Sequence, residues 1–458
     1  MKTLFILMWF VLLGIPGNTV AQTNVLDVYI AEGMKNNLVL KQKNISLDKA
    51  LLALQAAKSM YQPSVAFQAN YSTATGGRNI ALPLGDLLNP VYATLNQLTG
   101  SSQFPMLENQ SINFLPTNYY DARIRTTVPI INTDIIYNKR INEQQVTLQE
   151  FEVQTYEREL VKDIKSAYFN YLNAQQAVSI YQSALSLAKE SRRVNERLLA
   201  NGQGLHAYVL RSESEIEQVE AQVTQAEQQR ENARLYFNAL LNRDGESSID
   251  TLKDVAHSLL MASSMLREGG GITGREELKS LQEVIDINEN MVKMNRKFTI
   301  PKMNGFLDVG SQAEELRFNN QSRYLMLGLQ FDLPIYSGNR NRTKVKQSML
   351  ELEEAVLNKA HITRQLTVSS GVARNNLEAA WSTYRSSLKQ LEAAASYQRL
   401  IDKGYQAGTN TYIETIDARN QLTSARLSTE VNKYNVLLAA AELEREYATY
   451  PLKETENE

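Results

Sequence analysis

Hydrophobic and polar positions alternate in four short stretches of this chain, at about 65–73, 120–128, 304–312 and 324–333. A period of two places successive side chains on opposite faces, so each stretch predicts a β-strand. Each strand has about the length that crosses a bilayer when tilted. The first pair of strands is separated by residues 74–118, whose low periodicity predicts a long loop, whereas the second pair has a short one.

After each pair of strands, the spacing of apolar residues changes to that of an α-helix. Very long helices are predicted at about 132–200 and 341–403. At 1.5 Å per residue the first of these would be about 100 Å long. Further helices are predicted at about 205–241 and 411–447, where apolar residues recur in heptads. Such a seam is typical of a coiled coil, so each helix is expected to pack along a neighbour of comparable length.

The order of strands and helices occurs twice. Pro129 and Pro334, at the two strand-to-helix transitions, are 205 positions apart, and Gly202 and Gly408, at the two helix breaks, are 206 apart. This constant spacing predicts two internal structural repeats. The predicted segments are a first repeat at 22–245, a linker at 246–275, a second repeat at 276–450 and a disordered tail at 451–458.

Residues 1–21 have the pattern of a secretory signal peptide, with Lys2, an apolar run from Leu4 to Ile15 and a small residue, Ala21, at the cleavage position. The chain contains no cysteine, which excludes disulfides, thiolate metal sites and a lipid anchor through cysteine. Its formal net charge of -2 provides no basic surface for nucleic acid. We therefore expect an exported protein whose membrane attachment comes from the fold.

Two segments carry a resemblance to a known family. The segment Gly404–Ala418 (GYQAGTNTYIETIDA) and the segment Phe331–Gly338 (FDLPIYSG) are similar to the helix tip and the strand-to-helix passage of the TolC family of outer-membrane efflux proteins. The likeness spans nearly the whole mature chain and includes the duplication. Four strands cannot close a membrane barrel, because open edges would leave unpaired amides in lipid. Several chains are therefore needed, and the resemblance implies three.

The resemblance implies a mixed α and β membrane fold. Its homotrimer would form a twelve-stranded β-barrel in the outer membrane of a Gram-negative bacterium, in contact with outer-membrane lipid, with four strands from each chain. This barrel would continue into a long α-helical coiled-coil barrel in the periplasm. The implied partners are a periplasmic adaptor (membrane fusion) protein and an inner-membrane transporter of the RND or ABC type.

The function expected is that of a passive exit duct in a tripartite efflux pump. An outer-membrane duct for type I protein secretion is the alternative that the sequence does not separate. A periplasmic coiled-coil adaptor is more distant, because it would carry one helical hairpin and no duplicated strands. No catalytic motif is present, and His206, His257 and His361 lack metal-ligand spacing. We expect no enzyme activity, no metal and no cofactor.

The helix tip of the second repeat is the candidate working part. Thr411 and Glu414 have the spacing of a capping box, which would restart the last helix after the turn. The resemblance also places acidic rings at Glu414 and Asp417, so three chains would present six carboxylates to the lumen. Like charges held this close raise one another's pKa and attract cations.

The resemblance further implies polar links that hold the tip shut. Tyr405 matches the tyrosine of that network, but Asn410 stands where the family has arginine and Tyr208 where it has aspartate. The family's ionic lock therefore cannot form here, and Tyr405 and Tyr208 are expected to close the tip by ring packing and hydroxyl hydrogen bonds. Residues of the two tip turns are expected to contact the adaptor: Gly202, Ala207, Ala407, Gly408, Thr409 and Thr411.

Overall fold

The computed structural model describes residues 25–115, 117–251 and 255–452, so the predicted signal peptide at 1–21 and most of the predicted tail lie outside the described residues. The chain divides into two compact units. The sheet unit comprises Lys49–Val146 and Val284–Ala355, and the helical unit comprises the rest. Among the described residues, no helix is long and apolar enough to cross a membrane.

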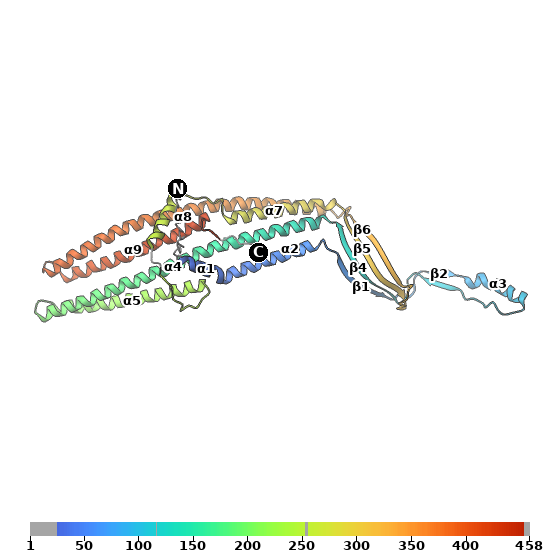
Figure 1. Ribbon diagram of the computed structural model, residues 1–458, viewed down its shortest axis with the longest axis horizontal. Coiled ribbons are helices and arrows are strands. Elements are labelled where there is room, and N and C mark those ends of the chain that lie inside the picture. Colours follow the sequence, from blue (N-terminus) through green and yellow to red (C-terminus); the bar gives the residue numbers. More distant parts are fainter. Residues whose placement is uncertain (1–24, 116, 252–254, 453–458) are drawn as a thin grey trace, which may run out of the picture. The chain divides into compact units, whose positions relative to one another are not determined.

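The sheet unit contains a four-stranded antiparallel sheet in the order β1-β4-β5-β6 (Figure 1). Its strands are β1 Ser64–Ser72, β4 Tyr119–Ile131, β5 Lys302–Glu314 and β6 Arg323–Asp332. Each overlaps one of the four stretches in which the sequence alternates. The central pairing, β4 with β5, joins a strand of the first repeat to a strand of the second. The two outer strands, β1 and β6, come one from each repeat.

The two faces of this sheet differ in polarity. One row across it consists of Phe67, Ile124, Val309 and Leu325, and each of these side chains is about half exposed or more. On the opposite face, Nε and Nη2 of Arg125 donate to the two carboxylate oxygens of Asp308 at 2.7 and 2.6 Å. The side chain of Asp308 is fully buried. The alternation of the sequence thus yields one apolar, exposed face and one polar, internally bonded face.

The two transition prolines occupy different structures. The expectation that Pro129 ends its strand is wrong: β4 continues to Ile131, and the pairing with β5 shifts register between Pro129 and Ile131. A proline is tolerated at such an irregularity because it has no N–H to donate to the ladder. Pro334 follows the end of β6 and lies in a loop, in which Gly338 has a φ of +61°, before α8 begins at Arg340.

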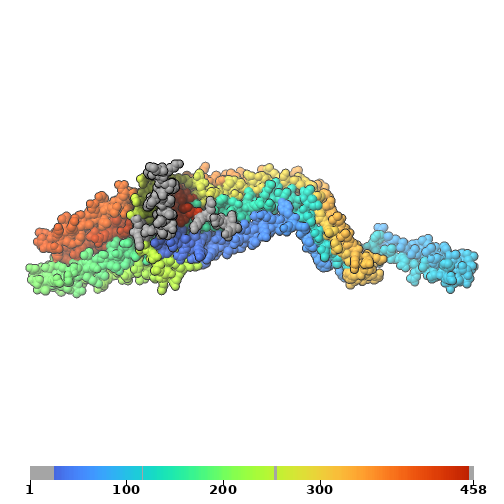
Figure 2. All heavy atoms as spheres, in the orientation of Figure 1, coloured from blue at the N-terminus to red at the C-terminus, as the bar shows by residue number. Residues whose placement is uncertain are grey.

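The segment 74–118 is not the irregular loop expected from its low periodicity. It contains β2 Asn79–Leu82, α3 Leu84–Thr99 and β3 Gln110–Asn113, with β2 and β3 paired antiparallel. Asparagines of this segment hydrogen-bond to its backbone groups. Asn109 Oδ1, for example, accepts from the amides of Gly85 and Asp86 at the start of α3. The stretch that carries α3 is cyan in Figure 2.

The helical unit is built from two pairs of long helices and shorter helices packed on them. Asn37 separates the first two helices, and its Oδ1 accepts from the amides of Val39 and Leu40 at 2.9 and 3.0 Å. Helices α2, α4, α7 and α8 also contribute residues to the sheet unit. The bounds are α1 Val25–Asn36, α2 Leu38–Ser59, α4 Thr133–Ala200, α5 His206–Leu240, α6 Val255–Glu268, α7 Glu276–Arg296, α8 Arg340–Gln406 and α9 Tyr412–Tyr447; a 3₁₀ turn, η1, covers Lys297–Thr299.

The core of the helical unit combines aromatic packing with buried ion pairs. Tyr29 contacts the rings of Tyr168 and Phe237 at centroid distances of 5.8 and 5.1 Å, and all three are nearly inaccessible to solvent. Arg275, which is 1% exposed, is paired with Glu446 of the last helix. Because removing one partner of a buried pair leaves an uncompensated charge, this contact constrains how the segment after α6 meets α9.

Candidate functional site

The turn between α4 and α5 is the first of two similar helix tips. Gly202 has a φ of +73°, a left-handed conformation that glycine adopts without strain. The Gly202 amide donates to Leu199 O and the Gln203 amide to Leu198 O, at 3.0 and 2.8 Å, which is the Schellman arrangement. Helix α5 then starts after Leu205, whose side chain makes no capping hydrogen bond.

The turn between α8 and α9 ends its first helix in the same way. Gly408 has a φ of +80°, and the Thr409 amide donates to Gly404 O at 2.9 Å. The next helix, however, begins with the predicted capping box. Thr411 Oγ1 accepts from the Glu414 amide, and the Glu414 carboxylate accepts from the Thr411 amide at 2.6 Å. The amides of Thr411 and Glu414, which have no partner within the helix, are thereby both hydrogen-bonded. No side chain does the same at the start of α5.

Glu414 and Asp417 are both exposed on α9. Glu414 also accepts from the side-chain amide of Asn410 at 3.2 Å, and Asp417 accepts from Gln421 at 3.0 Å. The backbone hydrogen bond from Thr411 is the main cause that lowers the pKa of Glu414 below its ordinary value. Within one chain, the pKa of Glu414 therefore moves opposite to the rise expected from rings of like charges.

Tyr405 and Tyr208 are brought together by a third tyrosine. The Tyr405 hydroxyl donates to Asn195 Oδ1 on α4 at 2.9 Å, which connects the second repeat to the first. The ring of Tyr412 lies 6.0 Å from that of Tyr405 and 5.4 Å from that of Tyr208. Tyr412 therefore lies between Tyr405 and Tyr208, which were expected to pack directly on each other.

Tyr412 is the first residue of α9 and is 1% exposed. Its hydroxyl accepts from Ser191 Oγ at 3.0 Å and donates to Glu215 Oε2 at 3.3 Å. Ser191 lies on α4 and Glu215 on α5, so one side chain of the second repeat joins both long helices of the first. We call Ser191, Asn195, Tyr208, Glu215, Tyr405 and Tyr412 the tip cluster.

Glu215 supplies the buried charge of the tip cluster. Burial, the largest cause, raises its pKa above the ordinary value, whereas Arg419, the Tyr412 hydrogen bond and Arg211 act in the opposite direction. Arg419 is itself incompletely satisfied: its Nη2 lies 3.9 Å from Asp402, and its Nε and Nη1 are buried without a partner among the described residues. The charge balance of the tip thus depends on Glu215 and Arg419 together.

Sequence reasoning did not identify Tyr412, Ser191, Asn195 or Glu215. A local signal existed for Tyr412, because Tyr412 and Ile416 are four residues apart and both are buried, so the apolar face of α9 starts at its first residue. No local signal marks Asn195, which is 210 residues from Tyr405. Its role depends on a long-range contact.

The expected adaptor-contact residues lie on the surface of the turns. Among them, Ala207, Ala407 and Thr409 are exposed, as are Gly202, Gly408 and Thr411. Small exposed side chains leave the backbone of both turns accessible. In the described parts of the chain, no group of three or more histidines, cysteines or acidic residues is placed to hold a metal ion.

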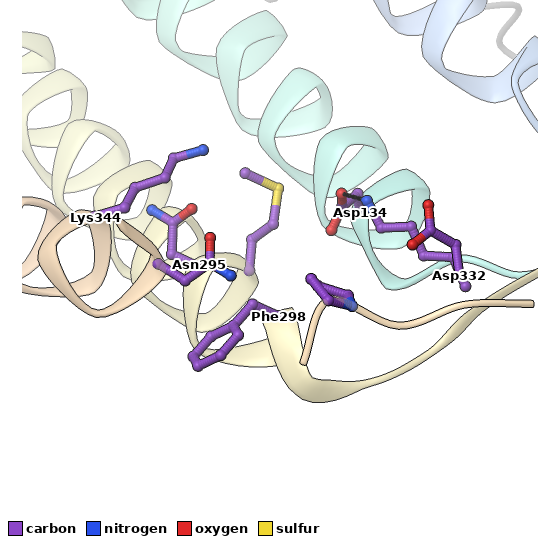
Figure 3. Close-up of a pocket in the computed structure, with 9 residues that line it drawn as sticks. Asp134, Asn295, Phe298, Asp332 and Lys344 are labelled. Carbon is purple, nitrogen blue, oxygen red and sulfur yellow. Dashed lines mark hydrogen bonds and ion pairs between the residues drawn. The ribbon is translucent and has the colours of Figure 1, made fainter. Parts of the chain in front are cut away.

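A pocket of about 330 Å³ lies at the strand-to-helix transition of the sheet unit (Figure 3). Pro334 lines it, and an ion pair between Lys302 and Asp134 crosses it at 2.5 Å. In the view of Figure 3, Lys344 lies at one end and Asp332 at the other. The lining residues are Asp134, Met294, Asn295, Phe298, Lys302, Asp332, Pro334, Asn341 and Lys344. The pocket shares no residue with the tip cluster, and its ion pair joins β5 to the start of α4, which indicates a structural role.

Comparisons with known proteins agree with this architecture. Residues 274–446 match the family model described as outer membrane efflux protein. The outer membrane protein TolC of Escherichia coli (strain K12) is 22% identical over 436 residues, which cover 91% of this chain and 80% of that protein. The Campylobacter jejuni CmeC outer membrane channel superposes with a TM-score of 0.72 at 16% identity, covering 92% of this chain and 85% of that one.

The open state of the Neisseria gonorrhoeae MtrE outer membrane channel is also similar, with a TM-score of 0.69 at 16% identity and coverage of 93% of this chain and 89% of that chain. The family model matches the second repeat, while the structural likeness extends over both repeats. The predicted resemblance to these outer-membrane channels is confirmed. The chain has the fold of the TolC-like outer-membrane channels, and its second repeat matches the outer membrane efflux protein family model.

Proposed function

We propose that three copies of this chain form the passive exit duct of a tripartite efflux pump in the outer membrane of a Gram-negative bacterium. The observation that carries the proposal is the exposed apolar face of the sheet, on which Phe67 and Leu325 are each 72% exposed and Leu327 is 81% exposed. Strands with an apolar outer face and a polar inner face suit contact with lipid on one side and a lumen on the other.

The outer strands support the trimer. In a membrane the free edges of β1 and β6 would leave backbone groups without partners, so each must pair with another chain. Cyclic association satisfies this requirement because the β1 edge of one copy meets the β6 edge of the next. Three copies of four strands give the twelve-stranded barrel that the family resemblance implies.

The tip cluster supports a closed periplasmic end. Its hydrogen bonds join α9 and α8 of the second repeat to α4 and α5 of the first, so the two helix pairs cannot separate without breaking them. Glu414 and Asp417 would line the entrance beside these contacts, as the resemblance implies. The exposed residues of the two turns, including Ala207 and Ala407, would meet the periplasmic adaptor, which connects the duct to an inner-membrane transporter of the RND or ABC type.

Deletion of the gene tests the cargo directly. We expect higher sensitivity to toxic small molecules and an unchanged set of secreted proteins, measured together in the same deletion strain. Complementation with the intact chain should restore resistance. A strain that keeps its resistance but loses a secreted protein would contradict small-molecule efflux and would assign the duct to type I protein secretion.

A further inference from the structure

Helix α3, in the segment between β1 and β4, carries an apolar seam that the proposed function does not use. Five apolar residues follow one another along α3 in steps of four, three, four and three. This is the heptad spacing of a coiled-coil seam. Four of the five side chains are between 36% and 77% exposed, although each is Leu or Val. The seam consists of Leu84, Leu88, Val91, Leu95 and Leu98.

The neighbouring face of α3 is already covered by the return segment of the same hairpin. Asn89 donates to Leu107 O at 2.9 Å and accepts from its amide at 2.7 Å, and Asn96 makes the same pair of bonds with Phe104, at 2.8 and 3.0 Å. These two-point contacts fix the rotation of the helix about its axis. The seam is therefore held facing outward, and no other segment of its own unit covers the visible face of this stretch (Figure 2).

Charge does not oppose the approach of a second copy of this helix. Asp86 is the one charged residue among the 16 of α3, and its carboxylate accepts from Asn109 at 3.0 Å. It follows Leu84 by two positions, which at about 100° per residue places it on the side of the helix away from the seam. Two identical α3 helices would meet through apolar side chains alone.

We propose that the α3 helices of three copies associate along this seam into a parallel three-helix bundle that closes the outer end of the duct. The inference rests on the trimer of the proposed function. Rotational symmetry makes the three helices parallel and in register, which is the arrangement that a heptad seam requires. The seam places Leu88 and Leu95 at one core position, and Leu84, Val91 and Leu98 at the other. No β-branched residue stands at the first of these positions, where two-stranded coiled coils favour one.

The association is reversible because the helix is short. A helix of 16 residues is marginal by itself, so the bundle depends on the barrel to hold its three members close together. Helix α3 begins twelve positions after the end of β1, the outer strand that pairs with the next copy in the proposed barrel. The trimer thus supplies the local concentration, and cargo moving outward can separate the helices.

Cysteine crosslinking in the full-length chain tests the bundle, because the natural sequence has no cysteine. The variant Val91→Cys places a thiol in the seam, and Gln97→Cys places one on the exposed opposite side of α3 as the matched control. Under oxidation in intact outer membranes, we expect covalent dimers from Val91→Cys and several-fold less from Gln97→Cys. Efflux-dependent resistance should fall on oxidation of Val91→Cys and return after reduction.

The outcomes separate this inference from the proposed function. A chain that does not run as a trimer in mild detergent overturns both. A trimer in which the two cysteine variants crosslink equally overturns the bundle alone. If Val91→Cys fails to crosslink but reacts with a lipid-soluble maleimide and is shielded from a water-soluble one, the seam lies in the outer leaflet of the membrane and the bundle is likewise wrong.

Discussion

The two helix tips end their first helix in the same way and start their second helix differently. Both use a glycine with positive φ in a Schellman turn, at Gly202 and at Gly408. After the turn, α9 is fixed by the Thr411 capping box, whereas α5 has no side-chain cap. The duplicated chain has therefore kept the turn and changed the start of the next helix.

This difference gives the two tips separate tasks. The second tip presents Tyr412, whose buried ring is held in place by the capped start of α9. The first tip and its helices provide the surroundings, with Ser191 on α4 and Tyr208 and Glu215 on α5. One repeat supplies the inserted side chain and the other supplies the site that receives it. Substitutions at the two tips test this division.

Replacing the inserted ring should have the largest effect. We expect Tyr412→Ala to destabilise the tip by about 3 to 5 kcal/mol, the range for truncating a large buried aromatic side chain. Hydrogen exchange of the amides near both tips should rise, and the closed-state conductance of reconstituted channels should increase. Tyr412→Phe is the matched control, because it keeps the ring but removes the bonds to Ser191 and Glu215, with an expected cost of about 1 to 3 kcal/mol. Unchanged exchange in Tyr412→Ala would refute a central role for this ring.

The acidic pair belongs to the second tip and should make it the cation-binding side. The double variant Glu414→Gln/Asp417→Asn should weaken block by multivalent cations about tenfold, because clefts lined by one sign of charge raise counter-ion concentration by at least that factor. Single-channel recordings in a planar bilayer measure the block. Glu217→Gln, at an exposed position of α5, is the control and should leave block unchanged. Equal block in all three proteins would contradict the assignment.

Exchanging the caps should make the tips more alike. Thr411→Ala removes the capping box and should cost about 1 kcal/mol of local stability, whereas Leu205→Thr offers α5 a cap at an exposed position and should gain about 0.5 kcal/mol or more. Hydrogen exchange of the first-turn amides of each helix reports both changes. Opposite signs at the two tips are expected. A loss of protection in both variants would mean that Leu205 stabilises the start of α5 by contacts that a threonine cap does not replace.

A pH dependence of opposite sign at the two tips should be the weakest of these effects. The pKa of Glu215 is raised, so its stabilising contribution is fully present below the ordinary glutamate value of 4.5 and is lost as pH rises through the raised pKa. The pKa of Glu414 is lowered, so its contribution is present above 4.5 and is lost as pH falls through the lowered pKa. Local stability at the first tip, from exchange corrected for intrinsic rates, should therefore rise slightly on mild acidification. Glu215→Gln should abolish that slope and keep the opposite slope that Glu414 gives to the second tip.

Much of the architecture could be predicted because it depends on local periodicity. Alternation located the four strands, and glycine marked the two helix breaks, since glycine adopts the left-handed conformation that such a turn requires. The capping box was equally readable, because its two partners are three residues apart. Helix α3 was missed although its apolar spacing is helical, because its asparagines and Pro90 are also typical of loops. The hydrogen bonds of Asn89 and Asn96 to backbone groups are visible only in the tertiary structure.

Local sequence patterns were sufficient to predict the duplication, the four strands of the main sheet, the four long helices and the positions of both tip turns. The acidic rings at Glu414 and Asp417 come from the family resemblance and stay a prediction. The tertiary structure was needed to show that Tyr412 is the centre of the tip cluster, that Tyr405 bonds Asn195 and that the α3 seam is uncovered. The physical reason is range. Helical and strand periods are set by neighbours a few residues apart, whereas the surroundings of Tyr412 are assembled from residues 221 and 197 positions away in the chain. Composition and spacing do not encode that juxtaposition, and the packing of the two repeats creates it.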